Sequence, residues 1–332
     1  MENKTFKAMV VTETAEKTFT RAITTRSIDD LPAGEVLIKV AYSSLNYKDA
    51  LSATGNKGVT RNYPHTPGID TAGVVAESQS DMFKPGEEVI VTSYDLGMNT
   101  SGGFAEYVRV PADWIVKLPA GLTMKEAMIY GTAGFTAGLS VNALIHMVKP
   151  DQGEVLVTGA SGGVGSVAVS ILTKLGYSVV AVGGIVEEKA YLTGIGAREV
   201  ISREDAADTS GKPVLKARWA GVIDTVGGDI LATAIKSTKY NGSVTCCGNA
   251  ASPDLPLSVF PFILRSVRLL GIDSQNCPMA LRTRIWEKLA SAWRLDGLAG
   301  ISSEITLEDL DNRIQLMLQG KNKGRTVVKV NA

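Results

Sequence analysis

The segment from residue 155 to residue 182 constrains the fold of this chain more than any other. Its apolar run Val155–Val157 leads into the glycine-rich stretch Gly159–Gly165, and a helical pattern then connects to a second strand-like run, Val179–Val182. In such a βαβ unit, backbone N–H groups and the positive end of the helix dipole face a pyrophosphate. The segment therefore predicts a dinucleotide-binding site.

Two glycines of this stretch have separate predicted roles. Gly162 would let the backbone approach the phosphates, and Gly165 would allow close packing of the helix on the strand. Ala160 occupies the first glycine position of the G-x-G-x-x-G pattern, and that pattern is weak by itself. A tight turn without a ligand is therefore the alternative, although the βαβ context favours the dinucleotide.

The end of the second strand normally selects between NAD and NADP. An acid there binds the ribose 2′-OH of NAD, whereas its absence admits the 2′-phosphate of NADP. Here the strand ends in Val182-Gly183-Gly184-Ile185, with neither an acid nor an arginine. Glu187 and Glu188 follow in the predicted first turn of the next helix, where the helix dipole alone favours acids. We therefore expect a modest preference for NADP, with NAD as the alternative.

The pattern of apolar residues predicts two domains. Short strand-like runs occupy residues 36–42, 72–77 and 87–92, and Thr123 and Glu126 have the spacing of a capping box ahead of a helix. From Glu154 onward, strand-like and helical patterns alternate, which is typical of a parallel sheet covered by helices on both faces. The fold class is thus α/β, with a doubly wound parallel sheet and a β-rich domain that ends near residue 125.

Composition excludes several classes of protein. The chain has 34 Lys and Arg against 34 Asp and Glu, so no overall basic field would attract nucleic acid. Its three cysteines, Cys246, Cys247 and Cys277, have neither a disulfide framework nor metal-ligand spacing, which favours a reducing cytoplasmic setting. We find no uninterrupted apolar run of about 18 residues and no signal peptide, so we expect a soluble protein without a membrane partner.

Several motifs resemble those of the medium-chain dehydrogenase/reductase superfamily, and the resemblance covers essentially the whole chain. Within the superfamily, the chain is similar to the zinc-free quinone oxidoreductase branch and most similar to its acryloyl-CoA reductase subgroup. The segments that carry the resemblance are 43–49, 64–75, 131–137, 160–165, 261–265 and 324–328. It implies a GroES-like catalytic domain at residues 1–125, a Rossmann domain at 126–271, a return to the catalytic domain at 272–332, and a homodimer.

The residues that bind zinc in relatives are replaced here. Zinc alcohol dehydrogenases of this superfamily carry Gly-His-Glu where this chain has Gly68-Ile69-Asp70, and a metal-binding Cys near Asn46. The four-cysteine lobe expected between about residues 90 and 110 is also missing. His65 and His146 are too separated to form a site, and we interpret them as ordinary core or surface residues. No metal is therefore expected.

Without zinc, reduction of a C=C bond conjugated to a carbonyl is favoured over carbonyl reduction. Hydride adds at the β-carbon, and hydrogen bonds then suffice to hold the enolate. Asn46 and Tyr47 are the candidate catalytic residues, because a hydroxyl or an amide could donate to the carbonyl oxygen or the nicotinamide ribose. Tyr47 as a packed aromatic is the alternative, whereas the resemblance also matches Tyr47 to a cofactor-contacting tyrosine.

The resemblance implies further cofactor contacts. The pyrophosphate would be touched by Ser161, Gly162, Gly163 and Val164, and the adenosine ribose by Gly183, Gly184 and Ile185. The 2′-phosphate would be contacted by Arg203. The nicotinamide would be lined by Asn249, Ile263 and Ser274, and the cofactor would also be contacted by Arg325. Two departures matter. NADP-using relatives have Ser-Gly-Arg in place of Gly183-Gly184-Ile185, and an apolar residue is usual in place of Asn249.

The predicted function is hydride transfer from NADPH to a small α,β-unsaturated carbonyl compound, an enoyl thioester such as acryloyl-CoA. The alternatives are reduction of a quinone and, from another class, a dinucleotide-binding structural or sensing protein without turnover. Basic residues favour the thioester, because CoA phosphates need cationic partners. These residues are Lys57, Arg61, Arg265, Arg268, Arg282 and Arg284.

Overall fold

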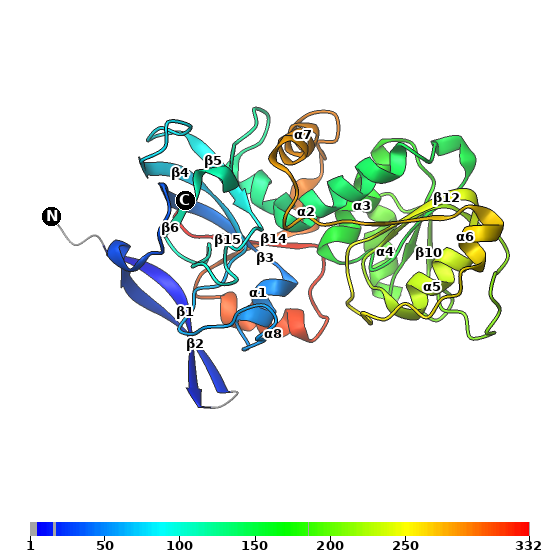
Figure 1. Ribbon diagram of the computed structural model, residues 1–332, viewed down its shortest axis with the longest axis horizontal. Helices are drawn as coiled ribbons and strands as arrows, with labels where there is room; N and C mark the ends of the chain where they lie inside the picture. Colours follow the sequence, from blue (N-terminus) through cyan, green and yellow to red (C-terminus); the bar gives the residue numbers. More distant parts are fainter. Residues whose placement is uncertain (1–4, 16–17, 185, 332) are drawn as a thin grey trace. The chain divides into compact units, whose positions relative to one another are not determined.

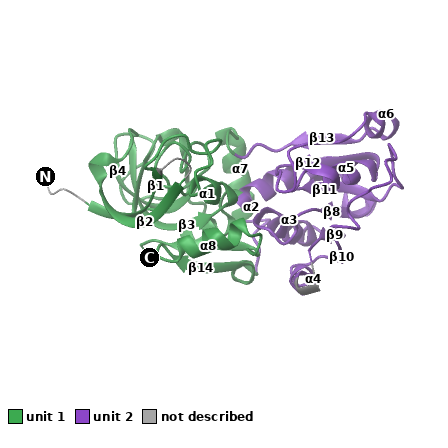
Figure 2. Cartoon of the chain, turned by 90° about the horizontal axis from the view of Figure 1, so that it is seen from below, with its two compact units in different colours: residues 1–132, 275–290, 297–332 green, residues 133–274, 291–296 purple. Residues whose placement is uncertain are grey.

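The computed structural model describes residues 5–15, 18–184 and 186–331, and the chain divides into two compact units (Figure 2). Unit 1 contains Met1–Thr132, Gln275–Ala290 and Gly297–Ala332, and unit 2 contains Ala133–Ser274 and Ser291–Asp296. The division falls later than the predicted boundaries at residues 125 and 271. In addition, Ser291–Asp296 belongs to unit 2, although the sequence placed it in the returning segment of the catalytic domain.

Unit 1 is built mainly from antiparallel strands (Figure 1). Its strands are β1 (Thr5–Ala15), β2 (Thr18–Ser27), β3 (Val36–Leu45), β4 (Asp70–Ser78), β5 (Glu88–Thr92), β6 (Tyr107–Val110), β7 (Ile115–Lys117), β14 (Ser302–Thr306) and β15 (Arg325–Lys329). A 7-stranded sheet has the order β14-β15-β3-β4-β5-β7, with β6 also paired to β3, while β1 and β2 form a separate antiparallel pair. The predicted β-rich domain is confirmed.

Among the described residues of unit 1, three α-helices lie within the unit and a fourth spans its boundary. They are α1 (Tyr47–Ser52), α7 (Met279–Ala290), α8 (Leu310–Leu318) and the boundary helix α2 (Met124–Ile145). The predicted capping box starts α2, because the Thr123 backbone N donates to Glu126 at 2.9 Å and the Glu126 backbone N donates to Thr123 Oγ1 at 3.2 Å. Gly131 has φ +51° and interrupts the helical backbone.

Unit 2 has the expected doubly wound topology. Its strands are β8 (Val155–Val157), β9 (Val179–Val182), β10 (Glu199–Ile201), β11 (Trp219–Asp224), β12 (Thr238–Cys246) and β13 (Arg268–Gly271), and its helices are α3 (Gly163–Lys174), α4 (Val186–Gly194), α5 (Gly228–Lys236) and α6 (Phe260–Arg265). The sheet order is β10-β9-β8-β11-β12-β13, and every pairing is parallel. This is the dinucleotide-binding strand order 3-2-1-4-5-6.

The apolar pattern places each core inside its own unit. In unit 1, strands β3, β4 and β5 bury Ile38, Val75 and Val89, and in unit 2, strands β8, β9 and β11 bury Leu156, Val180 and Val222. Helix α2 is long and apolar enough to cross a membrane, but 78% of its most apolar window is buried inside the protein. Such burial is typical of a core helix.

Candidate functional site

The glycine stretch of unit 2 forms a tight turn from β8 into α3. Gly159 adopts φ +57°, and a Cβ there would lie 2.2 Å from Thr225 Oγ1. A Cβ at Gly165 would lie 2.3 Å from the Gly159 carbonyl oxygen, so helix and turn approach too closely for any other residue. Gly162 caps the helix. The turn therefore presents the first N–H groups of a 12-residue helix with no side chain beyond Cα at Gly162 and Gly163.

A buried polar cluster ties this turn to the neighbouring strand β11. Thr158 Oγ1 donates to Asp224 Oδ1 at 2.7 Å and accepts a bond from the Thr225 backbone N at 3.0 Å. The other carboxylate oxygen of Asp224 accepts from the Gly227 backbone N at 2.9 Å. Burial raises the pKa of Asp224. Sequence reasoning missed this cluster, although an acid at the end of an apolar strand signals a buried group that needs partners.

The parallel sheet gathers most of the predicted cofactor residues at one edge. Ser161–Val164 follow the carboxyl end of β8, Gly183 and Gly184 follow β9, and Arg203 follows β10. Asn249 and Ser274 follow the carboxyl ends of β12 and β13. Ligands of such sheets bind at the carboxyl edge where the strand order reverses, which here lies between β8 and β11.

Ile263 does not belong to this edge. It lies in α6, directly before the amino end of β13, and its side chain is 68% exposed. Arg265 anchors the same helix by donating to the Lys236 and Thr238 carbonyl oxygens at the amino end of β12. The structure therefore places Ile263 away from Asn249 and Ser274, with which it was predicted to line the nicotinamide, because the connection to β13 returns to the amino ends of the strands. Ile185, also predicted, lies outside the described residues.

Beside the end of β9 lies Glu188, an acid that we had interpreted only as a residue of the first turn of the next helix. The Glu188 carboxylate reaches back from α4 and accepts a hydrogen bond from the Gly184 backbone N. A Cβ at Gly184 would lie 3.1 Å from Glu188 Oε2 and 3.2 Å from Arg203 Nη2, so both side chains flank this glycine. A Cβ at Gly183 would lie 2.7 Å from Leu192 Cδ1, so a serine there would require the Leu192 side chain to shift.

In unit 1, the two predicted catalytic residues lie where β3 passes into α1. Tyr47 is the first residue of the helix and its side chain is 52% exposed, whereas Asn46 caps the helix and is buried. The Asn46 backbone N donates to Asp49 Oδ2 at 2.8 Å, which closes the first turn. The buried cap therefore fixes the backbone from which Tyr47 projects.

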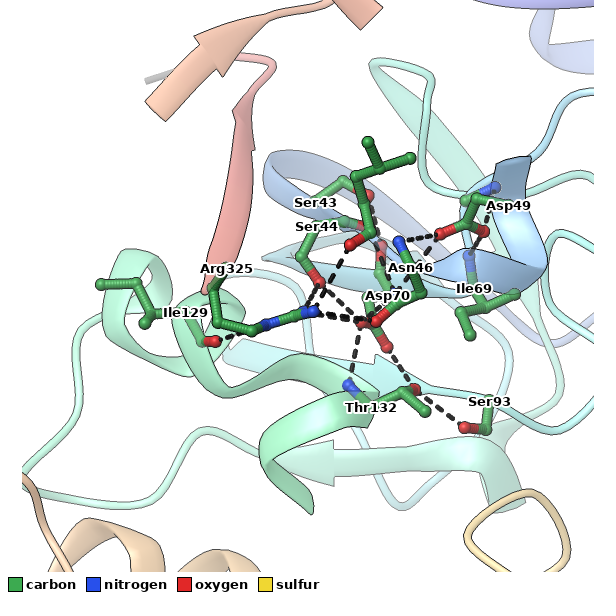
Figure 3. Close-up of polar contacts among 12 residues, drawn as sticks. Ser43, Ser44, Asn46, Asp49, Ile69, Asp70, Ser93, Ile129, Thr132 and Arg325 are labelled. Atoms are coloured by element: carbon green, nitrogen blue, oxygen red, sulfur yellow. Dashed lines mark hydrogen bonds and ion pairs between the residues drawn. The ribbon is translucent and has the colours of Figure 1, made fainter. Parts of the chain in front are cut away.

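Asn46 belongs to a buried network centred on Asp70 (Figure 3). Asp70 Oδ2 accepts bonds from Asn46 Nδ2 at 2.7 Å, from Ser44 Oγ at 2.6 Å and from the Thr132 backbone N at 2.9 Å. The Thr132 hydroxyl donates to the other oxygen of Asp70 at 2.6 Å. Gly131 packs against the network, because a Cβ there would lie 2.5 Å from Asp70 Oδ2. This contact accounts for the glycine that breaks α2.

Arg325 completes the network from β15. Its guanidinium lies 3.8 Å from Asp70 Oδ2 and donates to Asn46 Oδ1 at 3.2 Å, to Ser44 Oγ at 2.9 Å and to the Ile129 carbonyl oxygen at 2.9 Å. The residue is 2% exposed. The prediction that Arg325 contacts the cofactor is therefore wrong, since a buried acid needs a buried cation and these groups take its N–H donors.

The role predicted for Asn46 also changes. One N–H of its amide is directed at Asp70, and Asp49 Oδ2 and the Ser44 carbonyl oxygen accept from the same nitrogen at 3.3 Å and 3.4 Å. An amide has two N–H donors, so none is left for a substrate oxygen. The contacts of Asn46 hold the start of α1, the helix whose first residue is Tyr47.

Asp49 is the second buried acid at this helix. Its Oδ1 accepts bonds from the backbone N atoms of Gly68 and Ile69, at 3.1 Å and 2.8 Å. Burial, and then the neighbouring charge of Asp70, raise the pKa of Asp49 to about 7. Asp49 therefore joins α1 to the segment that carries Ile69, and its protonation changes near neutral pH.

The donor atoms here do not fit a zinc ion. Zinc is bound by Cys sulfur, His nitrogen and carboxylate oxygen, whereas Asn46 and Ile69 occupy the places of the Cys and His ligands, and the Arg325 guanidinium already neutralises Asp70. Within the part of the chain that the structure describes, no group of three His, Cys, Asp or Glu side chains could hold a metal. His65 Nε2 lies 2.9 Å from the Gly97 carbonyl oxygen, and burial lowers the pKa of His65.

The basic residues predicted to bind CoA phosphates are divided between the two units, and several of them have partners within their own unit. Arg265 and Arg268 belong to unit 2, whereas Arg282 and Arg284 belong to unit 1. Arg282 is fully buried, donates to the Thr92 carbonyl oxygen at 2.9 Å and stacks on the Tyr94 ring at 4.2 Å. Lys57 forms an ion pair with Glu13 at 2.8 Å. Structural contacts therefore account for Lys57, Arg265 and Arg282.

The chain is similar to known oxidoreductases over almost its whole length. The protein named "Putative quinone oxidoreductase YhfP" from Bacillus subtilis is 48% identical over 93% of this chain and 94% of its own length. The crystal structure of that protein with NAD bound has a TM-score of 0.95, with coverage of 98% and 99%. Acrylyl-CoA reductase AcuI of Ruegeria pomeroyi is 46% identical over 98% of this chain and 100% of its own.

A second solved structure and two family models agree with these relatives. The yhdH oxidoreductase from Salmonella enterica in complex with NADP is 44% identical, with a TM-score of 0.94 and coverage of 97% and 99%. The model for the alcohol dehydrogenase GroES-like domain matches residues 32–120, and the model for zinc-binding dehydrogenases matches residues 163–291. The chain therefore belongs to the medium-chain dehydrogenase/reductase family of NAD(P)H-dependent oxidoreductases, in the branch of quinone oxidoreductases and acrylyl-CoA reductases.

Proposed function

We propose that the protein reduces the activated C=C bond of a small α,β-unsaturated carbonyl compound, an enoyl thioester such as acryloyl-CoA, with NADPH as the favoured cofactor and NADH as the alternative. The observation that carries this proposal is the Asp70–Arg325 network, which fills the zinc position of relatives with an internal ion pair. Conjugate reduction needs only hydrogen-bond support for an enolate, so it suits such a site.

The residues of unit 2 fit the dinucleotide. The Gly162–Val164 start of α3 would hold the pyrophosphate, because Gly162 and Gly163 have no Cβ beside the first N–H groups of the helix. Gly183, Gly184 and Arg203 would contact the adenosine ribose and its 2′-phosphate, and Asn249 and Ser274 the nicotinamide side. The bound cofactor supplies the hydride.

Tyr47 is the residue proposed to act on the substrate. As the hydride adds to the β-carbon, negative charge moves to the carbonyl oxygen, and a hydroxyl that donates to this oxygen stabilises the transition state. A proton from water then completes the product at the α-carbon. The first turn of α1, and with it Tyr47, is held in place by the hydrogen bonds of Asn46 with Asp49, Asp70 and Arg325.

The choice between thioester and quinone rests on the relatives, since local contacts already engage Lys57, Arg265 and Arg282. The relative named acrylyl-CoA reductase matches this chain over its whole length, which favours the thioester. The relative named as a quinone oxidoreductase favours the alternative.

We also infer a zinc-independent homodimer in a reducing, cytoplasmic setting. The strand β13 lies at the edge of its sheet, and Val259, Phe260, Ile263 and Leu264 beside it are 64%, 43%, 68% and 58% exposed. A second copy related by a twofold axis would pair β13 antiparallel to itself and cover this apolar surface. Cys246, Cys247 and Cys277 form no disulfide within the described residues, which suits such a compartment.

The proposed function is tested by a panel of acceptors with each reduced nicotinamide, followed by nicotinamide absorbance. We expect kcat/KM for acryloyl-CoA to exceed that for acrolein by about 10² or more, because the CoA moiety supplies remote binding that positions the reacting carbons. Crotonyl-CoA tests the tolerance for a longer acyl chain. Faster turnover of benzoquinone would establish the quinone alternative. If none of these acceptors causes oxidation of NADPH or NADH, the remaining alternative is a dinucleotide-binding protein without turnover.

A further inference from the structure

Glu188 lies where dinucleotide-binding domains place the acid that contacts the adenosine ribose, although it comes from a different element. That acid normally ends the second strand, but here β9 ends at Val182 and two glycines follow. The Glu188 side chain, which is 9% exposed, fills this space from α4 by accepting the hydrogen bond of the Gly184 backbone N. Tertiary packing thus supplies an acid that the strand itself lacks.

Arg203 faces the same glycine with the opposite charge. Its Nη2 would lie 3.2 Å, and Glu188 Oε2 3.1 Å, from a Cβ at Gly184. The exposed guanidinium of Arg203 suits a 2′-phosphate, whereas the carboxylate suits the two ribose hydroxyls of NADH. The surroundings of Gly184 therefore combine groups that favour different nicotinamides.

We propose that Glu188 determines the cofactor preference of this protein by lowering its affinity for NADPH relative to NADH, against the attraction of Arg203. This inference rests on the proposed function, since it assigns the adenosine end of the same cofactor site. A 2′-phosphate beside Gly184 would meet the carboxylate as a like charge and would find the Gly184 N–H already bonded. Ribose hydroxyls would instead donate to the carboxylate.

The central test compares Glu188→Gln with the wild-type protein by calorimetry. Glutamine keeps an oxygen that accepts from Gly184 but removes the charge. We expect binding of NADPH, and of adenosine 2′,5′-bisphosphate as a probe without nicotinamide, to strengthen by about tenfold, and binding of NADH to weaken about threefold. These dissociation constants do not depend on turnover or on the acceptor.

Three further variants separate charge from loop support. Glu188→Asp keeps the charge, so its NADPH to NADH affinity ratio should stay near that of wild type even if the turn is loosened. Glu204→Gln removes an exposed acid next to Arg203 in the sequence and should leave the ratio within about twofold. Arg203→Met should weaken NADPH and the bisphosphate about tenfold, with little change for NADH.

The outcomes distinguish this inference from the proposed function. A wild-type protein that binds both nicotinamides, with a ratio that Glu188→Gln moves no more than Glu204→Gln does, overturns the role of Glu188 and leaves the reductase proposal intact. An equal shift in Glu188→Asp and Glu188→Gln overturns it too, because geometry rather than charge would then be responsible. A wild-type protein that binds neither nicotinamide overturns both.

Discussion

Arg325 Nη2 lies 3.8 Å from Asp70 Oδ2, with side chains that are 3% and 0% exposed. Arg325→Met would leave the Asp70 charge buried beside Asn46 without its cation, and removal of one partner of a buried pair costs about 3–5 kcal/mol. We expect a loss of this order in the free energy of unfolding, measured in urea. The double variant Arg325→Met with Asp70→Asn should recover part of it, whereas equal stability of the single variant and wild type would contradict the prediction.

Stability should depend on the protonation of Asp49. Its pKa is raised from 3.8 to about 7 in the folded protein, so between these values the folded state binds a proton that the unfolded state has released. Stability should therefore fall as pH rises from about 4 to about 7, by at most about 1.4 kcal/mol per pH unit from this group. Urea unfolding at several pH values measures the slope, and Asp49→Asn should flatten it. The variant should also be less stable overall, because an amide has one acceptor oxygen and cannot accept from Asn46 as well as from Gly68 and Ile69.

Tyr47→Phe should lower kcat/KM without unfolding the protein. A donor that contacts developing charge contributes about 10²- to 10³-fold, and one that only orients the cofactor contributes less. Because the Tyr47 side chain is 52% exposed, we expect a change in unfolding free energy below about 0.5 kcal/mol. Tyr240, which is 70% exposed in unit 2, provides the matched Phe variant. Equal kinetics in the two variants would return Tyr47 to a packing role.

Gly165→Ala should disrupt the dinucleotide turn. The new methyl group would lie 2.3 Å from the Gly159 carbonyl oxygen, and such overpacking costs about 1–3 kcal/mol. We expect lower stability in urea together with weaker NADPH binding by calorimetry. Gly194→Ala is the control, because a Cβ there meets no atom within 4 Å. If the two variants bind NADPH equally well, the turn does not hold the phosphates.

Activity should survive removal of metal ions. The Asn46, Ile69 and Asp70 side chains do not form a zinc site, since Arg325 already balances the buried acid. We expect the purified protein to retain its rate in chelator, with zinc well below one ion per chain by elemental analysis. Stoichiometric zinc that is lost together with activity would refute this prediction.

Local sequence patterns predicted much of unit 2. The runs at Val155–Val157 and Val179–Val182 are strands, and Gly162–Gly165 begins a helix between them. These predictions succeed because apolar periodicity and glycine placement act within a few residues. The strands β1 and β2 were missed. Their partners decide their place, because β1 pairs with β2 and also bridges to Ala105 and His65 far along the chain.

The sequence by itself determined that this chain contains a βαβ dinucleotide unit, a β-rich partner domain and the motifs of its family. Tertiary structure alone decided what individual polar residues do. Arg325 and Asn46 are internal partners of Asp70, Glu188 reaches Gly184, and Ile263 lies at the opposite sheet edge. The physical reason is that a charged or polar group acts on a ligand only when its hydrogen bonds are not already taken, and its partners come from distant parts of the chain.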